Sequence, residues 1–207
     1  MVFYINGVYQ AVAFVVIEGI DGSGKSTVIS LLSKLLPRVY VTREPSASPI
    51  GRLIKEWALR EGTADPRVDA LLFAADRIEH YKREIEPRLR EGYIVICERY
   101  VESSIAYQGA AGVPIEYIKF INSAVPKPDI TVILDVDPEV AIARVKQRGT
   151  AEKYEQLSFL KRVRGIYLSR AAEEGYPVLD ASRPAEEVAK EVARLIEKRL
   201  GSRESTS

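Results

Sequence analysis

The sequence has little of several residue types that often mark a function or a compartment, with one cysteine, one histidine and one tryptophan in 207 residues. Cys97 lies in an apolar run and is interpreted as a small buried hydrophobic residue rather than a reactive thiol, which favours the cytoplasm. No apolar stretch reaches 18 residues and no secretory leader is recognisable, so we expect neither membrane insertion nor secretion. The formal net charge is only +1, which disfavours a nucleic-acid partner.

What the sequence does contain fits a single α/β domain over residues 1–207, because 46% of the residues are apolar and can form a sizeable core. Strand-like runs alternate with helical patterns, which predicts a parallel sheet covered by helices on both faces. The strands are expected near 13–18, 38–42, 93–97, 130–135 and 177–179. The helices are expected near 25–36, 50–61, 67–90, 114–124, 138–148, 156–174 and 184–199. Pro87 should bend or break the third helix, Asn6-Gly7 favours a hairpin or an extension of the first strand, and residues 201–207 should form a frayed tail.

A complete phosphate-binding loop pattern, Gly-Ile-Asp-Gly-Ser-Gly-Lys-Ser, occupies residues 19–26 between an apolar strand and an amphipathic helix. The glycines allow backbone N–H groups to surround an anion at the start of the helix. Lys25 can reach the terminal phosphates of a nucleotide, and the Ser26 hydroxyl can ligate Mg²⁺. A purely structural turn is disfavoured because strand and helix are both in place. The expected ATP-binding residues of the loop are Gly19, Ile20, Asp21, Gly22, Ser23, Gly24, Lys25, Ser26 and Thr27.

The loop by itself fits a kinase, a GTPase or a motor, but the Asn-Lys-x-Asp segment that reads guanine in GTPases is absent. Further segments are Thr42-Arg-Glu-Pro45, Leu71-Leu-Phe-Ala-Ala-Asp-Arg77, Glu98-Arg-Tyr100 with residues 103–109, Arg148-Gly149 and Glu152-Lys-Tyr-Glu155. With these segments the chain resembles thymidylate kinases from about residue 14 to residue 198. The resemblance implies the three-layer P-loop kinase fold, with a five-stranded parallel sheet and a small mobile lid at about 148–156. It also implies transfer of the γ-phosphoryl group of ATP to dTMP for dTTP biosynthesis, a requirement for Mg²⁺, and a homodimer.

The expected acceptor site combines spacing with this resemblance. Phe73 and Arg77 are four residues apart on one helix face, so an aromatic plane and a forked donor can meet the same base. By resemblance, Phe73 stacks on thymine, Arg77 donates to its carbonyl edge, and Asp21 holds the 3′-hydroxyl. Core packing is the alternative for Phe73, whereas a buried guanidinium without a partner would be costly. The implied substrate-binding residues are Asp21, Glu44, Phe73, Arg77, Arg99, Ser103, Tyr107 and Gln108.

Glu98 ends an apolar strand at the edge where open α/β sheets bind ligands. The family usually has aspartate at this position, where it organises Mg²⁺. The resemblance therefore implies Glu98 as a metal residue, together with Ser26 of the phosphate-binding loop. Arg99 resembles the arginine that bridges acceptor and donor phosphates. A solvated corner is the alternative for Glu98 and Arg99.

Gly22 occupies a loop position where some thymidylate kinases carry arginine, while others supply the charge from the lid. The sequence resembles the second kind, with Arg148 and Lys153 as candidates and Arg148 also beside adenine. A solvated lid surface is the alternative. The implied catalytic residues are Lys25, Glu98, Arg99, Arg148 and Lys153.

Other functions remain open at this stage. A deoxynucleoside kinase or a broader pyrimidine monophosphate kinase would share the loop and the lid, and a non-catalytic ATP-dependent switch would share the loop. His80 lies among Glu79, Lys82 and Arg83. It is interpreted as a solvated histidine rather than a general base, because phosphoryl transfer needs little proton chemistry. Trp57 is interpreted as packing.

Overall fold

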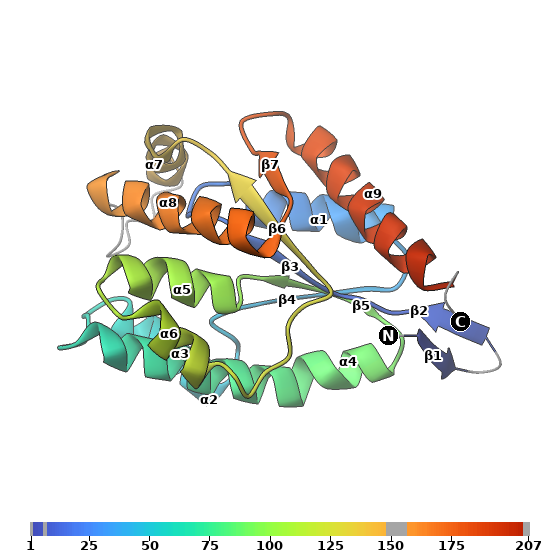
Figure 1. Ribbon diagram of the computed structural model, residues 1–207, viewed down its shortest axis with the longest axis horizontal. Coiled ribbons are helices and arrows are strands. Elements are labelled where there is room, and N and C mark those ends of the chain that lie inside the picture. The colour runs from blue at the N-terminus through green and yellow to red at the C-terminus, as the bar shows by residue number, and fades with distance from the viewer. Residues whose placement is uncertain (1, 6–7, 148–156, 205–207) are drawn as a thin grey trace.

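A computed structural model describes residues 2–5, 8–147 and 157–204. Its central sheet has five parallel strands in the order β4-β5-β3-β6-β7 (Figure 1). The strands are β3 Phe14–Glu18, β4 Val39–Arg43, β5 Ile94–Glu98, β6 Ile130–Asp135 and β7 Val178–Asp180. The strands predicted from the sequence and their parallel arrangement are therefore confirmed.

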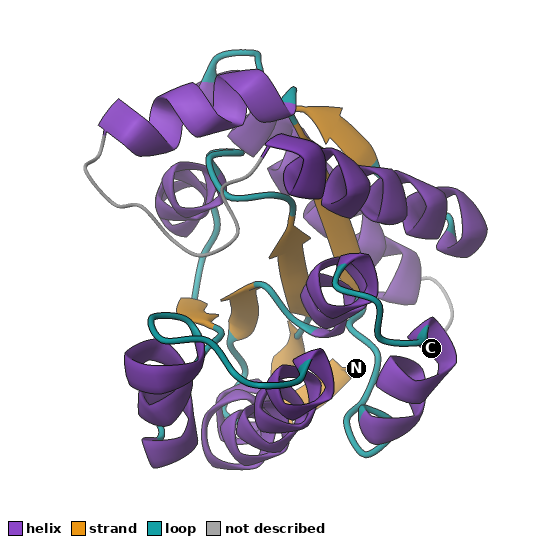
Figure 2. Cartoon of the chain, turned by 90° about the vertical axis from the view of Figure 1, so that its left-hand side faces the viewer, coloured by secondary structure: helices purple, strands orange, loops and turns teal. Residues whose placement is uncertain are grey.

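Helices cover both faces of this sheet, as Figure 2 shows from the side. α1 packs against α9 on one side, and α5 packs against α8. The helical elements are α1 Lys25–Leu35, α2 Pro49–Leu53, the π-helical turn η1 Ile54–Ala58, α3 Pro66–His80, the π-helical turn η2 Tyr81–Ile85, α4 Glu86–Arg90, α5 Val101–Ala110, α6 Ile115–Ile121, α7 Pro138–Gln147, α8 Leu157–Glu174 and α9 Ala185–Glu204.

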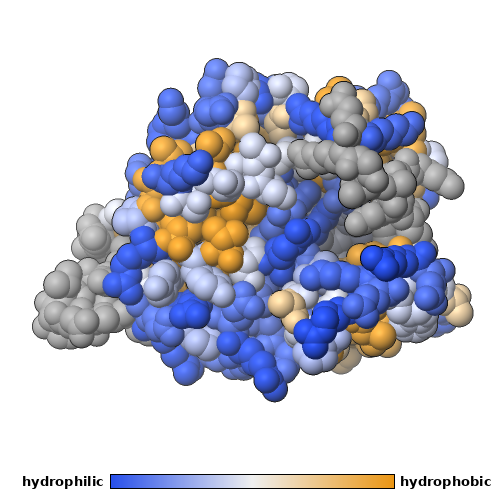
Figure 3. Space-filling view, turned by 180° about the vertical axis from the view of Figure 1, so that it is seen from behind, coloured by the Kyte–Doolittle hydropathy of each residue, from blue (hydrophilic) through white to orange (hydrophobic). Residues whose placement is uncertain are grey.

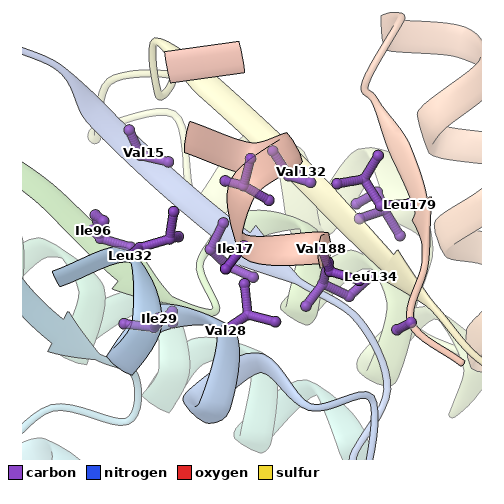
Figure 4. Close-up of a cluster of buried hydrophobic side chains, with 14 of the residues drawn as sticks. Val15, Ile17, Val28, Ile29, Leu32, Ile96, Val132, Leu134, Leu179 and Val188 are labelled. Carbon is purple, nitrogen blue, oxygen red and sulfur yellow. The ribbon is translucent and has the colours of Figure 1, made fainter. Parts of the chain in front are cut away.

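The core forms where the central strand β3 is buried on both faces. All five of its residues are buried, as expected for a parallel strand covered on both sides. Val15 and Ile17 belong to a buried cluster that includes Val28 of α1 and Val188 of α9 (Figure 4). Burying each such aliphatic side chain stabilises the fold by about 1.5–3 kcal/mol. The strand that leads into the phosphate loop is therefore anchored in the buried core.

Two helix predictions need correction. α5 was not predicted, because it is buried on most sides and carries polar side chains such as Glu102, Ser104 and Gln108 instead of an apolar stripe. Pro87 was expected to bend or break the third helix, but it does not break it, since helical residues run without interruption from Pro66 to Arg90. It lies in the first turn of α4 after the π-helical turn η2, where a missing backbone N–H is tolerated.

The terminal segments differ in how well they were predicted. β1 Val2–Ile5 and β2 Val8–Ala11 pair antiparallel as a separate two-stranded sheet, which confirms the hairpin, while its Asn6-Gly7 turn lies outside the described residues. α9 continues to Glu204, so residues 201–204 are helical and that part of the expected tail is wrong. Among the described residues, no helix combines the length and apolar character needed to span a membrane.

Candidate functional site

The carboxyl ends of β3, β4 and β5 meet at one edge of the sheet, the usual ligand edge of open α/β folds. Arg43 at the end of β4 lies beside Glu98 at the end of β5, and Ile17 of β3 pairs with Glu98 on the other side. The backbone N–H of Glu44 donates to the Glu98 carbonyl at 2.9 Å, and the Arg99 N–H donates to the Ile17 carbonyl at 3.1 Å. Sheet pairing thus brings the residues that follow these strands together.

The phosphate loop links β3 to α1 and depends on glycine for close packing. Gly19 and Gly22 have φ values of 140° and 82°. A Cβ atom would lie 2.4 Å from the Leu134 carbonyl oxygen at Gly19, and 2.3 Å from the Ala141 carbonyl oxygen at Gly22. Any side chain at position 22, arginine included, would therefore require α7 to move.

Lys25 is 4% exposed and turns back over the loop. Its Nζ donates to the carbonyl oxygens of Gly19 at 3.0 Å and Ile20 at 2.9 Å. Burial, together with the nearby Arg99, lowers the Lys25 pKa to about 8. The Ser23 hydroxyl is also buried and has no partner among the described residues. An unpaired buried hydroxyl in a loop rich in N–H groups fits the binding of a phosphate oxygen.

Ser26 and Glu98 are brought together at the start of α1, where the Ser26 hydroxyl donates to Glu98 Oε2 at 2.8 Å. Glu98 is 9% exposed, and the Arg99 side chain is 13% exposed. The alternative of a solvated corner for this pair is therefore wrong. An oxygen pair of this kind is the donor set that Mg²⁺ prefers, so these residues fit such an ion.

Asp21, Arg99 and Tyr107 form a compact charged group next to the loop. The Arg99 guanidinium pairs with Asp21 and donates to Ser103 Oγ at 3.2 Å. The Tyr107 hydroxyl donates to Asp21 Oδ2 at 2.8 Å and accepts from the Asp21 backbone N–H at 3.1 Å. Burial would raise the pKa of Asp21, but Arg99, Lys25 and the Tyr107 hydrogen bond outweigh it and hold that pKa at about 2. Asp21 is therefore a carboxylate at neutral pH.

Glu18, for which the sequence suggested no role, fixes the neighbouring Ser103. Its Oε1 accepts from the Ser103 backbone N–H at 3.1 Å, and its Oε2 accepts from the Ser103 hydroxyl at 2.6 Å and the Tyr167 hydroxyl at 3.0 Å. The fully buried position of Glu18 raises its pKa. A carboxylate at the end of a buried strand was visible in the sequence, but its partners on α5 and α8 were not.

A cavity of about 410 Å³ opens beside this group and is large enough for a small molecule. Seven of the eight predicted acceptor residues line it, namely Asp21, Glu44, Phe73, Arg99, Ser103, Tyr107 and Gln108. Arg43 and Lys55 also line the cavity and add positive charge. No role was predicted for Arg43, although its position at the end of a strand was a usable signal. The Oε1 atom of Gln108 is buried and has no partner among the described residues.

Arg77 does not line this cavity and is only 1% exposed. Its Nε donates to Glu44 Oε2 at 2.8 Å, and its Nη2 donates to the Tyr100 carbonyl at 2.9 Å and to Ser104 Oγ at 3.1 Å. The expectation that Arg77 would be hard to accommodate in the core is wrong, because Glu44 balances its charge. Contact between Arg77 and a base remains a prediction.

His80 is buried at 2% exposure, so its interpretation as a solvated histidine is wrong. The exposed neighbours in the sequence were misleading, because the ring points toward Thr42 and Glu44 of a different element. The lid candidates Arg148 and Lys153 lie outside the described residues, and their roles remain predictions.

A smaller hollow of about 180 Å³ lies on the other side of the loop, lined in part by Ser23, Thr27, Arg144 and Arg183. Arg144 Nη1 donates to the Gly22 carbonyl at 3.3 Å and to the Ala181 carbonyl at 3.1 Å. Sequence reasoning missed Arg144, which lies on a helix with other charged residues and stood out by no motif.

Comparisons with known proteins show which family this sequence resembles. A family model described as thymidylate kinase matches residues 17–192. A probable thymidylate kinase of Pyrobaculum aerophilum is 78% identical over 186 residues, which cover 90% of this chain and 97% of that protein. One of Archaeoglobus fulgidus is 39% identical over 198 residues, covering 93% of this chain and 99% of that protein. A thymidylate kinase of Symbiobacterium thermophilum is 43% identical over 205 residues, covering 92% and 95%.

Proposed function

The chain belongs to the thymidylate kinase family, and we propose that it transfers the γ-phosphoryl group of ATP to dTMP, giving dTDP and ADP. The observation that supports this proposal most is that the phosphate loop and the acceptor cavity share a wall. Asp21 belongs to the loop and lines the cavity, and Arg99 lines the cavity while its side chain pairs with Asp21. A donor phosphate in the loop and an acceptor in the cavity would therefore be neighbours.

At the donor end, the loop N–H groups and the Lys25 ammonium would hold the phosphates and spread the charge that develops during transfer. Lys25 must leave the carbonyl oxygens of Gly19 and Ile20 to do so, exchanging two neutral acceptors for an anionic one. Mg²⁺ would be held by Ser26 and Glu98 and would neutralise phosphate charge when bound. Positioning and electrostatics would then account for most of the catalysis.

At the acceptor end, Phe73 offers an aromatic face and Gln108 offers a buried carbonyl oxygen without a partner among the described residues. That oxygen would accept from the ring N–H of thymine or uracil, a donor that cytosine lacks at the equivalent position. Arg43, Lys55 and Arg99 would surround the acceptor phosphate with positive charge. The cavity therefore favours a phosphorylated thymine-type nucleotide over a nucleoside.

We further propose that the protein is a cytoplasmic homodimer. Large apolar side chains are exposed on consecutive helical elements, with Leu53 at 45%, Trp57 at 37%, Leu71 at 48% and Ile78 at 38%. Exposed apolar residues that gather on neighbouring elements are typical of protein interfaces. On the face seen in Figure 3, hydrophobic residues gather in one patch left of the centre and in smaller patches among hydrophilic residues. The interface is therefore proposed on the α2–α3 surface defined by these four side chains.

The experiment that tests this function is a coupled ADP-release assay with ATP and a panel of thymidine, dTMP, dUMP and dCMP. We expect dTMP to be the best acceptor, dUMP to be weaker, and thymidine and dCMP to be poor. Activity that favours thymidine would indicate a deoxynucleoside kinase, and similar activity on dCMP would indicate a broader pyrimidine monophosphate kinase. Slow ATP turnover that no acceptor changes would contradict catalysis and support a nucleotide-dependent switch.

A further inference from the structure

We propose that His80, the single histidine of the chain, is a positioning residue for the acceptor cavity and is held as a doubly protonated imidazolium that fixes Glu44. The part of this proposal that concerns the acceptor rests on the proposed function. The protonation state does not rest on it, because it follows from hydrogen bonds among Thr42, Glu44, Arg77, His80 and Glu84, here called the His80 cluster.

The His80 cluster joins the end of β4 to the long helical stretch below the cavity. His80 Nε2 lies 2.7 Å from Thr42 Oγ1, and Thr42 Oγ1 donates to Glu84 Oε1 at 2.5 Å. On the other side of the ring, His80 Nδ1 lies 3.3 Å from Glu44 Oε1. The His80 side chain is 0% exposed and that of Glu44 is 2% exposed, so water contributes little to either group.

The hydrogen bonds of Thr42 and Glu44 determine which nitrogens of the His80 imidazole carry a proton. Thr42 has one hydroxyl proton, which it donates to Glu84, whose partly exposed carboxylate can only accept. Thr42 must therefore accept at its other contact, so Nε2 of His80 carries a proton. If Nδ1 were bare, its lone pair would face a carboxylate oxygen without a proton between them, an arrangement that is unfavourable in a buried site.

The proton between Nδ1 and Glu44 belongs to the ring because Arg77 stabilises the Glu44 carboxylate. Arg77 Nε donates to Glu44 Oε2 at 2.8 Å, and the two side chains form an ion pair at 2.7 Å. With His80 protonated, the His80 cluster contains two cations, Arg77 and His80, and two anions, Glu44 and Glu84. Neutrality of this kind is what a buried group of charges requires.

A metal ion is the competing interpretation, because ligand atoms of Glu44, His80 and Cys97 all lie within 4.8 Å of one another. The atoms that would ligate a metal already take part in hydrogen bonds, however. Glu44 Oε2 accepts from Arg77, and the Cys97 thiol donates to the Arg99 carbonyl at 3.1 Å. Burial raises the pKa of Cys97 well above its usual value, so this group is a thiol and not the thiolate that a metal would bind.

The His80 cluster matters for the acceptor because two of the groups it holds line the cavity. Glu44 is a cavity residue, and Ser104, which accepts from Arg77, is another. Loss of the donor at Nδ1 would free one oxygen of Glu44 and let the carboxylate turn toward the cavity, where an acceptor phosphate would be repelled. Binding of the acceptor should weaken, while binding of ATP in the loop should not.

The direct test is the ¹⁵N NMR spectrum of the full-length protein labelled at histidine, which contains one imidazole and needs no assignment. We expect both ring nitrogens to carry a proton at neutral pH, as the hydrogen bonds to Thr42 and Glu44 require. One protonated and one bare nitrogen at neutral pH would overturn the proposal. A large change in these signals on adding Zn²⁺ would support the metal interpretation and also overturn it.

The functional test compares His80→Gln with Lys82→Gln, an exposed position on the next turn with 60% side-chain exposure. His80→Gln should raise the KM for dTMP by about tenfold or more, as expected for loss of a charged hydrogen bond, with the KM for ATP within about twofold. Lys82→Gln should match the parent. Equal losses for both substrates would indicate a merely structural role. If His80→Gln does not fold, the NMR spectrum of the parent still decides, and it does so whether or not dTMP is the acceptor.

Discussion

We propose that Lys25 is the residue whose charge lies closest to a nucleotide bound in the phosphate loop. Replacing it with alanine should lower turnover by at least about a hundredfold, because a preorganised electrostatic contact to the transferring group is lost. Steady-state ADP release measures this effect, and circular dichroism checks the fold. Lys34→Ala, an exposed lysine on the same helix, is the control and should behave like the parent. Near-normal turnover of a folded Lys25→Ala protein would rule out the loop as the donor site.

The lowered pKa of Lys25 also predicts how ATP binding depends on pH. The ammonium of the free protein loses its proton as the pH rises through about 8, so ATP affinity should be constant below that pH and fall above it. The stability of the fold changes with pH in the opposite direction from ATP affinity. Between about 8 and the usual 10.5 the unfolded chain binds the extra proton, so the Lys25 contribution to stability improves as pH rises through this window.

Isothermal titration with an ATP analogue across this range measures the affinity. Lys25→Arg should remove the pH dependence, because a guanidinium stays protonated throughout. Persistence of the same pH dependence in Lys25→Arg would assign it to another group.

Among single residues, those that belong to a motif could be predicted from the sequence, whereas the partners of buried residues could not. Lys25, Ser26 and Glu98 could be placed from the loop pattern and from the end of a strand. The burial of Arg77 and His80 could not, because their partners Glu44 and Thr42 come from a distant strand and its loop. Sequence neighbours report the charge of a helix surface, but they do not show which other element covers it.

At the scale of elements, the loop and α7 are held together by a close contact at Gly22. Gly22→Ala should destabilise the protein by about 1–3 kcal/mol, because the residue has a positive φ and its Cβ would lie 2.3 Å from the Ala141 carbonyl oxygen. Its ATP affinity should fall as well, since the loop cannot keep its shape. Thermal unfolding and nucleotide titration check the two effects.

Gly165→Ala is the matched control, since this glycine lies within α8 and a Cβ there meets nothing within 4 Å. We expect it to stabilise the protein by about 0.5–1 kcal/mol through helix propensity. If Gly22→Ala is as stable as Gly165→Ala, the contact between the loop and α7 does not exclude a side chain at position 22.

The elements themselves were predictable where burial gives a clear pattern. The parallel strands are short apolar runs ending in a charge or glycine, and each was found within a residue or two. α5 escaped prediction because burial on most sides erased the amphipathic pattern, although it supplies Ser103, Tyr107 and Gln108 to the cavity. An element that supplies several residues of the cavity was therefore the one least visible in the sequence.

At the scale of the whole molecule, the sheet sets the distance between donor and acceptor. The loop follows β3, the Arg43-Glu44 corner lies at the end of β4, and the Glu98-Arg99 pair lies at the end of β5. Adjacent strands therefore bring the groups that we propose for both substrates to one edge. The order of the strands could be predicted only in outline from the sequence. The cavity could not be predicted, because it depends on how side chains of α3 and α5 pack. The resemblance to thymidylate kinases supplied the roles, and the fold explains why those residues meet.

The most direct test of the proposed transfer is to identify the product that the purified protein forms from γ-labelled ATP and dTMP. We expect the label to appear in dTDP in amounts equal to the ADP released. Omitting Mg²⁺ should abolish transfer, and replacing Lys25 with alanine should lower it by at least about a hundredfold. Release of labelled inorganic phosphate without labelled dTDP would show that the protein hydrolyses ATP and does not transfer phosphate to dTMP, so the loop and the cavity would not act on one pair of substrates.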